Sequence, residues 1–272
     1  MQINFSKLTA AGNDFVLIDN RKNIISAEDY PCLARKLCDR KYSIGADGLI
    51  LIEKSGKYDF KMKYFNSDGS HASMCGNGGR SISKFAYDIG AAKETMVFET
   101  DAGIITAEIL KDDKVKLDLY EPKDLKTDIK VDVEDVTFKV DFINTGVPHV
   151  IIFVDDIEKV EIVKYGRAVR YHALFAPDGT NVNFVKATQD KDNTILVRTY
   201  ERGVEDETLA CGTGIIASAI IAGLKGFAKS PVNIIARGGD RLSVSYKNDS
   251  GKITGVILEG PAITAFEGVV KI

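Results

Sequence analysis

The 272-residue sequence predicts an α+β fold made of two similar halves. A Cys-Gly-polar-Gly motif occurs twice, at 75–78 and 211–214, and each copy opens a run with helical character. The two cysteines lie 136 residues apart, half the length of the chain. Other landmarks recur at nearly the same offset: Gly12 with Gly146, Asp19 with Asp155, and Tyr64 with Tyr200. A duplicated domain explains this order, and the alternative is the general likeness of strand–helix units.

The first half reads as strands with two helices. Apolar segments bounded by turn residues predict strands at 3–8, 15–19, 49–53, 60–64, 97–100, 104–110 and 115–120. Ser26 and Asp29 resemble a capping box and Pro31 stands in the first turn, so a helix is predicted to about residue 40. A second helix follows Cys75 and ends near Gly90.

The second half repeats this plan after a charged segment at 121–135, which we interpret as the domain boundary. The halves are therefore 1–121 and 122–261, with a last strand within 262–272 that rejoins the first half. Strands are expected at 138–143, 150–155, 182–185 and 195–200, and the segment 201–207 reads as a polar loop. Helices are expected at 160–175 and from Cys211 to about 224.

Composition narrows the class of protein. The net charge of −3 with interspersed lysine and arginine gives no basic stripe, so no nucleic-acid partner is expected. The longest nearly apolar run, 215–224, is too short to span a bilayer, and the N-terminus lacks a signal-peptide pattern, so we expect a cytoplasmic protein without a membrane partner. The four cysteines include no Cys-x-x-Cys pair, which argues against structural zinc; Cys32 and Cys38 are interpreted as small core residues.

The paired cysteine motifs suggest proton transfer. A helix N-terminus carries unsatisfied N–H groups and the positive end of the helix dipole, which lower the pKa of a thiol and attract a carboxylate. If the two halves face each other, one thiolate can remove an α-proton while the other thiol protonates the opposite face. This arrangement suits stereoinversion next to a carboxylate, whose developing charge the amides stabilise.

The same residues resemble diaminopimelate epimerase over essentially the whole chain. The motifs that carry the resemblance are Gly12–Phe15, Gly45–Gly48, Asn66–Ser70, Met74–Arg80, Pro148-His149, Asn181–Phe184, Tyr200–Gly203 and Cys211–Gly214. The resemblance implies two pseudo-symmetric halves, each a mixed or antiparallel sheet rolled around a central helix. It also implies a cofactor-independent homodimer, with neither pyridoxal phosphate nor metal, that interconverts L,L- and meso-diaminopimelate in lysine and peptidoglycan precursor biosynthesis.

The resemblance also assigns roles to individual residues. It makes Cys75 and Cys211 the acid/base catalysts, and it implies that His149 and Glu201 tune their pKa values. The residues expected to contact the substrate are Asn13, Asn66, Gly76, Asn77, Asn183, Glu201, Arg202, Gly212 and Thr213. These types suit the task, because Arg202 can bind the distal carboxylate with two parallel hydrogen bonds and Glu201 can accept one from an ammonium group.

Several alternatives stay open. Many family members carry Asn where this chain has Val147, which cannot hydrogen-bond through its side chain, so a related racemase with another substrate is the runner-up. His149 can be an ordinary turn residue, and Arg202 can pair with Glu205 or Asp206 at the surface. The segment 212–217 satisfies a Gly-x-Gly-x-x-Ala nucleotide-binding pattern, but a polar loop precedes it in place of a buried strand. A binding module without catalysis is a further option.

Overall fold

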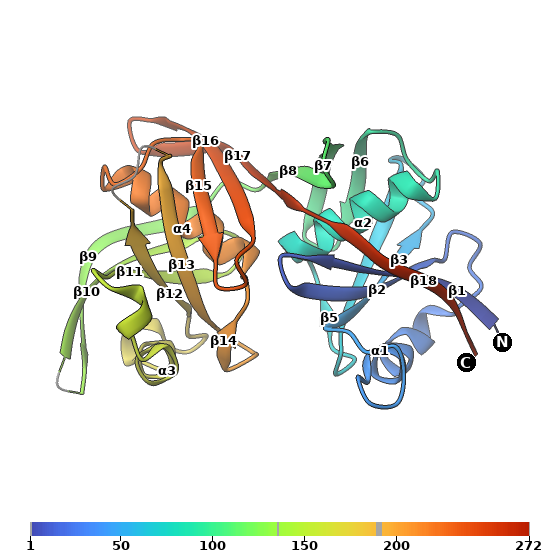
Figure 1. Cartoon of the computed structure of the whole chain (residues 1–272), viewed down its shortest axis with the longest axis horizontal. Helices are drawn as coiled ribbons and strands as arrows, with labels where there is room; N and C mark the ends of the chain where they lie inside the picture. The colour runs from blue at the N-terminus through green and yellow to red at the C-terminus, as the bar shows by residue number, and fades with distance from the viewer. Residues whose placement is uncertain (1, 135, 189–191, 272) are drawn as a thin grey trace. The chain divides into compact units, whose positions relative to one another are not determined.

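A computed structural model describes residues 2–134, 136–188 and 192–271 of the protein. The chain divides into two compact units (Figure 1). The first unit comprises Met1–Asp118 and Glu259–Ile272, and the second comprises Leu119–Leu258.

The first unit is a mixed sheet with two helices. Its strands are β1 (Gln2–Ala10), β2 (Asn13–Asp19), β3 (Gly48–Glu53), β4 (Phe60–Asn66), β5 (His71–Ala72), β6 (Thr95–Thr100), β7 (Gly103–Ile109), β8 (Lys114–Leu119) and the C-terminal β18 (Ile263–Lys271). Its helices are α1 (Tyr30–Cys38) and α2 (Gly76–Asp88). The sheet runs β18-β1-β2-β3-β4-β6-β7-β8, in which the pairs β2–β3 and β4–β6 are parallel and the others antiparallel; β5 also pairs with β4. The last strand, β18, pairs with β1 and lies in the first unit.

The second unit repeats the first unit's strand order from β18 to β7. Its strands are β9 (Lys123–Val133), β10 (Val136–Asn144), β11 (Pro148–Phe153), β12 (Asn181–Ala187), β13 (Thr194–Glu201), β14 (Asp206–Thr208), β15 (Val232–Ala236), β16 (Arg241–Asp249) and β17 (Lys252–Pro261), and its helices are α3 (Ile162–Arg170) and α4 (Gly212–Leu224). The order is β9-β10-β11-β12-β13-β15-β16, with β11–β12 and β13–β15 parallel. The short β14 pairs with β13 as β5 pairs with β4.

The helix that follows each cysteine lies at the centre of its unit. Helix α2 contacts β1, β2, β3, β7 and β18, and α4 contacts β10, β11, β12, β13, β15 and β16. Most positions of α4 are buried, which explains why this helix is apolar on all sides rather than amphipathic. Helices α1 and α3 cover the other face of their sheets through separate apolar clusters. The predicted α+β class, with each sheet curled around a central helix, is confirmed.

Strand register corrects two sequence landmarks. With Phe15 matched to His149, Asp19 corresponds to Phe153 and not to Asp155. Ile50 of β3 pairs with Tyr64 of β4, and the corresponding pair in the second unit is Asn183 with Thr199. Tyr64 therefore corresponds to Thr199 and not to Tyr200. Tyr200 instead belongs to the apolar cluster under α3. Matching the tyrosines by their distance from the cysteines was wrong, because the connection in the second unit is one residue longer, and a one-residue shift moves a strand residue to the opposite face.

Four local predictions also need correction. Ser26 precedes a single 3-10 turn at Ala27–Asp29, and in the described part of the chain its side chain makes no capping hydrogen bond. The helix predicted at 160–175 is interrupted after Arg170 and ends in a separate 3-10 turn at Ala173–Phe175. The segment 121–135, expected to carry no element, contains β9, which pairs with β10. The polar loop expected at 201–207 includes the start of β14.

Candidate active site

Cys75 is the N-cap residue of α2 in the first unit. Its backbone is extended, with φ −144° and ψ 128°, and its Sγ accepts a hydrogen bond from the Gly78 amide at 3.5 Å. The half-buried thiol also lies 3.8 Å from Asn13 Oδ1. Asn77 Nδ2 lies 3.5 Å from the same oxygen, so the fold brings together Asn13, Cys75 and Asn77, which lie up to 64 residues apart in the sequence.

Two neighbours fix the orientation of these amides. Asn13 Nδ2 donates to Asp47 Oδ2 at 2.5 Å, which turns its carbonyl oxygen toward Cys75. Asn77 Oδ1 accepts from Arg80 Nη2 at 2.8 Å, and the fully buried Arg80 also donates to the carbonyl oxygens of Gly76 and Pro261. Asp47 and Arg80 are thus positioning residues that sequence reasoning missed.

A charge network surrounds the base of this site. Asp14 forms ion pairs with the buried Lys7 at 2.8 Å and with Arg40 at 2.6 Å, and Arg40 also reaches Asp47 at 2.8 Å. Burial raises the pKa of Asp14, but the hydrogen bonds and charges of Arg40 and Lys7 outweigh it and lower this pKa to about 2. The carboxylate therefore stays charged at neutral pH, and the loop that carries Asp47 is held against β2.

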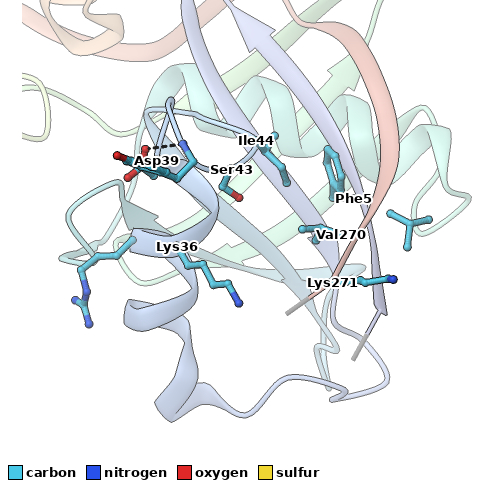
Figure 2. Close-up of a pocket in the computed structure, with 10 residues that line it drawn as sticks. Phe5, Lys36, Asp39, Ser43, Ile44, Val270 and Lys271 are labelled. Carbon is cyan, nitrogen blue, oxygen red and sulfur yellow. Dashed lines mark hydrogen bonds between the residues drawn. The ribbon is translucent and has the colours of Figure 1, made fainter.

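Asn66 stands at the end of β4, half-buried, and its Nδ2 donates to Ser70 Oγ at 3.0 Å. This bond closes the Asn66–Ser70 loop. A separate pocket of about 720 Å³ lies in the same unit between α1, β1 and β18 (Figure 2). Phe5, Lys36, Asp39 and Val270 are among its lining residues, whereas the predicted site residues lie elsewhere in the described part of the unit.

Cys211 is the N-cap residue of α4, at the corresponding place in the second unit. Its backbone is again extended, with φ −112° and ψ 111°, and its Sγ lies 3.5 Å from Thr213 Oγ1. The Thr213 carbonyl oxygen accepts from Thr145 Oγ1 at 2.9 Å, which fixes the first turn of α4 to the loop before β11. Gly212 is buried in this turn.

His149 is fully buried on β11, and the first turn of α4 passes close to its ring. Its Nδ1 lies 3.1 Å from Asn183 Nδ2 of β12, and Asn183 Oδ1 accepts from Thr199 Oγ1 of β13 at 2.9 Å. A Cβ atom on Gly214 would lie 3.3 Å from His149 Cε1. Burial, and then the positive charge of Arg202, lower the pKa of His149 to about 3, so the ring is neutral at physiological pH.

Glu201 and Arg202 lie at the end of β13, and both are half-buried. The Arg202 amide donates to Asn181 Oδ1 at 2.9 Å, and Asn181 Nδ2 donates to the Pro148 carbonyl oxygen at 2.9 Å. Asn181 thus ties Arg202 to the strand that carries His149. The Asn-x-Asn alternation at 181–183 is the sequence signal for this role, since it places both amides on one face of β12.

Comparison with known proteins decides the family. A sequence profile described as "Diaminopimelate epimerase" matches residues 5–123 and 142–264. A protein of Aquifex aeolicus (strain VF5) named diaminopimelate epimerase is 47% identical, covering 97% of this chain and 96% of its own. One of Hydrogenobaculum sp. (strain Y04AAS1) with the same name is 46% identical, covering 98% of both chains. The chain belongs to the diaminopimelate epimerase family. The predicted family is confirmed, and with it the isomerase class.

Solved structures more distant than the epimerase family share the fold. A phenazine biosynthesis protein of the PhzF family from Bacillus anthracis superposes with a TM-score of 0.77 at 18% identity, covering all of both chains. A hydroxyproline epimerase from Agrobacterium vitis superposes with a TM-score of 0.71 at 14% identity, covering 99% of this chain and 92% of its own. At such identities the similarity concerns the fold alone.

The remaining cysteines of this diaminopimelate epimerase family member differ from each other. Cys38 is buried as predicted, and burial raises the pKa of its thiol to about 12. Cys32 is exposed, so its interpretation as a core residue was wrong; it lies on the outer side of α1.

Among residues 2–134, 136–188 and 192–271, no cluster of three His, Cys, Asp or Glu side chains is arranged to hold a metal ion. In the same residues no helix is both long and apolar enough to cross a membrane.

Proposed function

We propose that this chain interconverts L,L- and meso-diaminopimelate, with Cys75 and Cys211 as its two acid/base groups. The observation that carries the proposal is that both units build the same feature. In each, an extended cysteine occupies the N-cap position of a buried helix that begins Gly-polar-Gly. Free amides and the positive end of a helix dipole favour both a thiolate and a substrate carboxylate.

The proton transfers balance over one turnover. One cysteine, as thiolate, takes the proton from the α-carbon and becomes a thiol. The resulting carbanion spreads its charge into the adjacent carboxylate, which backbone amides stabilise. The other cysteine, as thiol, gives its proton to the opposite face and becomes a thiolate. The mechanism requires that both thiols reach one substrate molecule, and it leaves the pair in the reversed protonation state after each turnover.

The substrate contacts follow from the residue chemistry. Gly76, Asn77, Gly212 and Thr213 supply donors at the two helix starts for the reacting carboxylate. At the other end of the substrate we assign the remaining polar residues: Asn13, Asn66, Glu201 and Arg202. Arg202 suits the distal carboxylate because its guanidinium can donate two parallel hydrogen bonds. His149 acts beside Cys211 as a neutral group rather than as an imidazolium.

Proton NMR in D₂O tests this proposal directly. Reduced enzyme without added cofactor is incubated with L,L-diaminopimelate, and we expect loss of the α-proton signal together with appearance of the meso isomer. Cys75→Ala and Cys211→Ala should each abolish the stereoinversion while the far-UV circular dichroism spectrum stays unchanged. Cys32→Ala is the matched control, since this exposed cysteine lies outside the motifs and should retain full turnover. Epimerisation by either motif variant would refute the two-base mechanism.

A related racemase with a different substrate is the second candidate. Val147 favours it, because this half-buried side chain offers no hydrogen bond where many family members have Asn. Loss of one hydrogen bond to a charged group costs about 1.5–3 kcal/mol. If diaminopimelate exchanges no α-proton, a panel of other amino acids in the same assay identifies the substrate. Val147→Asn should then gain activity on diaminopimelate.

The family resemblance supports three wider assignments. We place the reaction in lysine and peptidoglycan precursor biosynthesis, in the cytoplasm, and we expect a homodimer. Exposed apolar side chains on β18, including Phe266 and Val269 at 50% and 60% exposure, support an association surface in the first unit. Sedimentation velocity of the reduced protein measures the oligomeric state.

A further inference from the structure

A line of three polar side chains crosses the central face of the second unit. His149, Asn183 and Thr199 come from the adjacent strands β11, β12 and β13, and Asn183 pairs directly with Thr199 in the strand register. None is more than 3% exposed. The line faces α4, because a Cβ atom on Gly214 would lie only 2.3 Å from Asn183 Oδ1.

The hydrogen bonds fix which way the Asn183 amide points. Its Nδ2 lies 3.0 Å from the Val150 carbonyl oxygen, which only accepts, and its Oδ1 receives the Thr199 hydroxyl. The reversed amide would place two acceptor oxygens against each other. With the amide in this orientation, the remaining N–H of Nδ2 faces His149 Nδ1 at 3.1 Å. Nδ1 must therefore accept, and the ring proton resides on Nε2.

His149 Nε2 is then a buried donor, and it has no hydrogen-bond partner among the described residues. A buried N–H without a partner is costly, so such a group is retained where a ligand or a reacting atom supplies the acceptor. Asn183 itself offers little to a substrate, since both N–H groups of its amide face protein acceptors. This disagrees with its predicted role as a substrate contact.

The first unit shows that the fold does not need a histidine–asparagine–threonine line here. Phe15, Ile50 and Tyr64 occupy the three corresponding positions, and the rings of Phe15 and Tyr64 pack edge to face at 5.8 Å. Burial of the mainly apolar surface of these side chains stabilises the first unit with a smaller desolvation penalty than an imidazole, an amide and a hydroxyl would bring. The polar line in the second unit therefore serves something other than packing.

We propose that Asn183, oriented by Thr199, is a positioning residue that holds His149 as the neutral tautomer with its proton on Nε2. This N–H is thereby presented as a hydrogen-bond donor beside the first turn of α4, for an anionic acceptor of the reaction. An imidazolium would bring a second N–H against the Asn183 amide, so the same contact also opposes protonation of the ring. Burial, which lowers the pKa of His149, acts in the same direction. The inference rests on the proposed function only for the identity of the acceptor.

Imidazole NMR of the ¹⁵N-labelled full chain, reduced and without ligand, tests the tautomer itself. The sequence has three histidines, so His149→Gln assigns the signal. From about pH 6 to about pH 8, where an ordinary histidine titrates, we expect His149 to keep its proton on Nε2 and none on Nδ1. Asn183→Ala should lose this preference, and Thr199→Val, which keeps the side-chain volume, should weaken it. A wild-type ring protonated on Nδ1, or one that titrates in this range, would overturn the inference.

Kinetics with diaminopimelate test the consequence. Asn183→Ala should lower kcat by roughly 10- to 100-fold with little change in KM, because the residue orients a donor without touching substrate. Asn20→Ala is the matched control. Asn20 is a buried asparagine of the first unit, 2% exposed, whose amide bonds Ile25 and Tyr30, so it reports general destabilisation. Its variant should leave the His149 spectrum and kcat unchanged. If Asn183→Ala keeps both the Nε2-protonated tautomer of His149 and the wild-type kcat, the inference is overturned. If the wild-type protein shows this tautomer but does not epimerise diaminopimelate, only the proposed function is refuted.

Discussion

Gly78 and Gly214 occupy the same place in the two units, three residues after the cysteine, but a methyl group at each would meet different neighbours. At Gly78 the new Cβ would lie 3.1 Å from Ile50 Cδ1 and 3.4 Å from Met62 Cε, the ends of flexible side chains. At Gly214 it would lie 2.3 Å from Asn183 Oδ1. That oxygen cannot retreat easily, because it is buried and holds the Thr199 hydroxyl at 2.9 Å.

These contacts predict that the same substitution has a small effect on stability at Gly78 and a large one at Gly214. Alanine inside a helix gains about 0.5–1 kcal/mol over glycine. Gly78→Ala should therefore change the free energy of unfolding by less than about 1 kcal/mol. Gly214→Ala must overpack the core, at about 1–3 kcal/mol, and break a buried hydrogen bond, at about 1–3 kcal/mol. We expect a net destabilisation of about 3 kcal/mol.

Urea unfolding followed by far-UV circular dichroism measures the difference, since the chain contains no tryptophan for fluorescence. With a slope of about 3 kcal/mol per molar urea, Gly214→Ala should lower the midpoint by about 1 M. Gly78→Ala should leave it within about 0.3 M of the wild-type value. Equal midpoints for the two variants would refute the reasoning, because the argument depends on rigid Asn183 and flexible Ile50 responding differently.

Three further predictions follow from buried charge and exposure. The folded-state pKa of Asp14 is depressed, so its contribution to stability is present above about pH 4 and is lost as the pH falls through about 2. Asp14→Asn should therefore lower the urea midpoint at pH 7. An equally large difference between the midpoints of wild type and variant at about pH 2 would contradict this. Arg80→Met should destabilise the protein by about 3 kcal/mol, because it deletes hydrogen bonds to Asn77, Gly76 and Pro261. Lys36 is exposed, so Lys36→Met is the control and should cost less than about 0.5 kcal/mol in the same urea assay. In native protein at pH 8, iodoacetamide should alkylate Cys32 but not Cys38, as peptide mass spectrometry would show; modification of Cys38 before unfolding would count against its burial.

Local periodicity was enough to predict most of the elements. The alternation of Phe60, Met62 and Tyr64 marks β4, and the glycines after each cysteine mark where α2 and α4 begin. The paired motifs also indicated the family and the two thiols. These features can be read from the sequence because side-chain direction repeats every two residues in a strand and every 3.6 residues in a helix, and because a capping residue lies within four positions of the helix amides that it caps.

Only the tertiary structure shows which residues contact and orient the side chains of the candidate site. Asn183 binds His149 and Thr199, which lie 34 and 16 residues away, and Asn13 depends on Asp47, 34 residues on. Such partners are set by strand register, and register is set by packing on both faces of the sheet, which no local pattern contains. For the same reason Tyr64 corresponds to Thr199 rather than Tyr200. Which face of α1 packs on the sheet was likewise decided by tertiary structure: Cys32 is exposed, whereas Cys38, six residues further along the same helix, is buried.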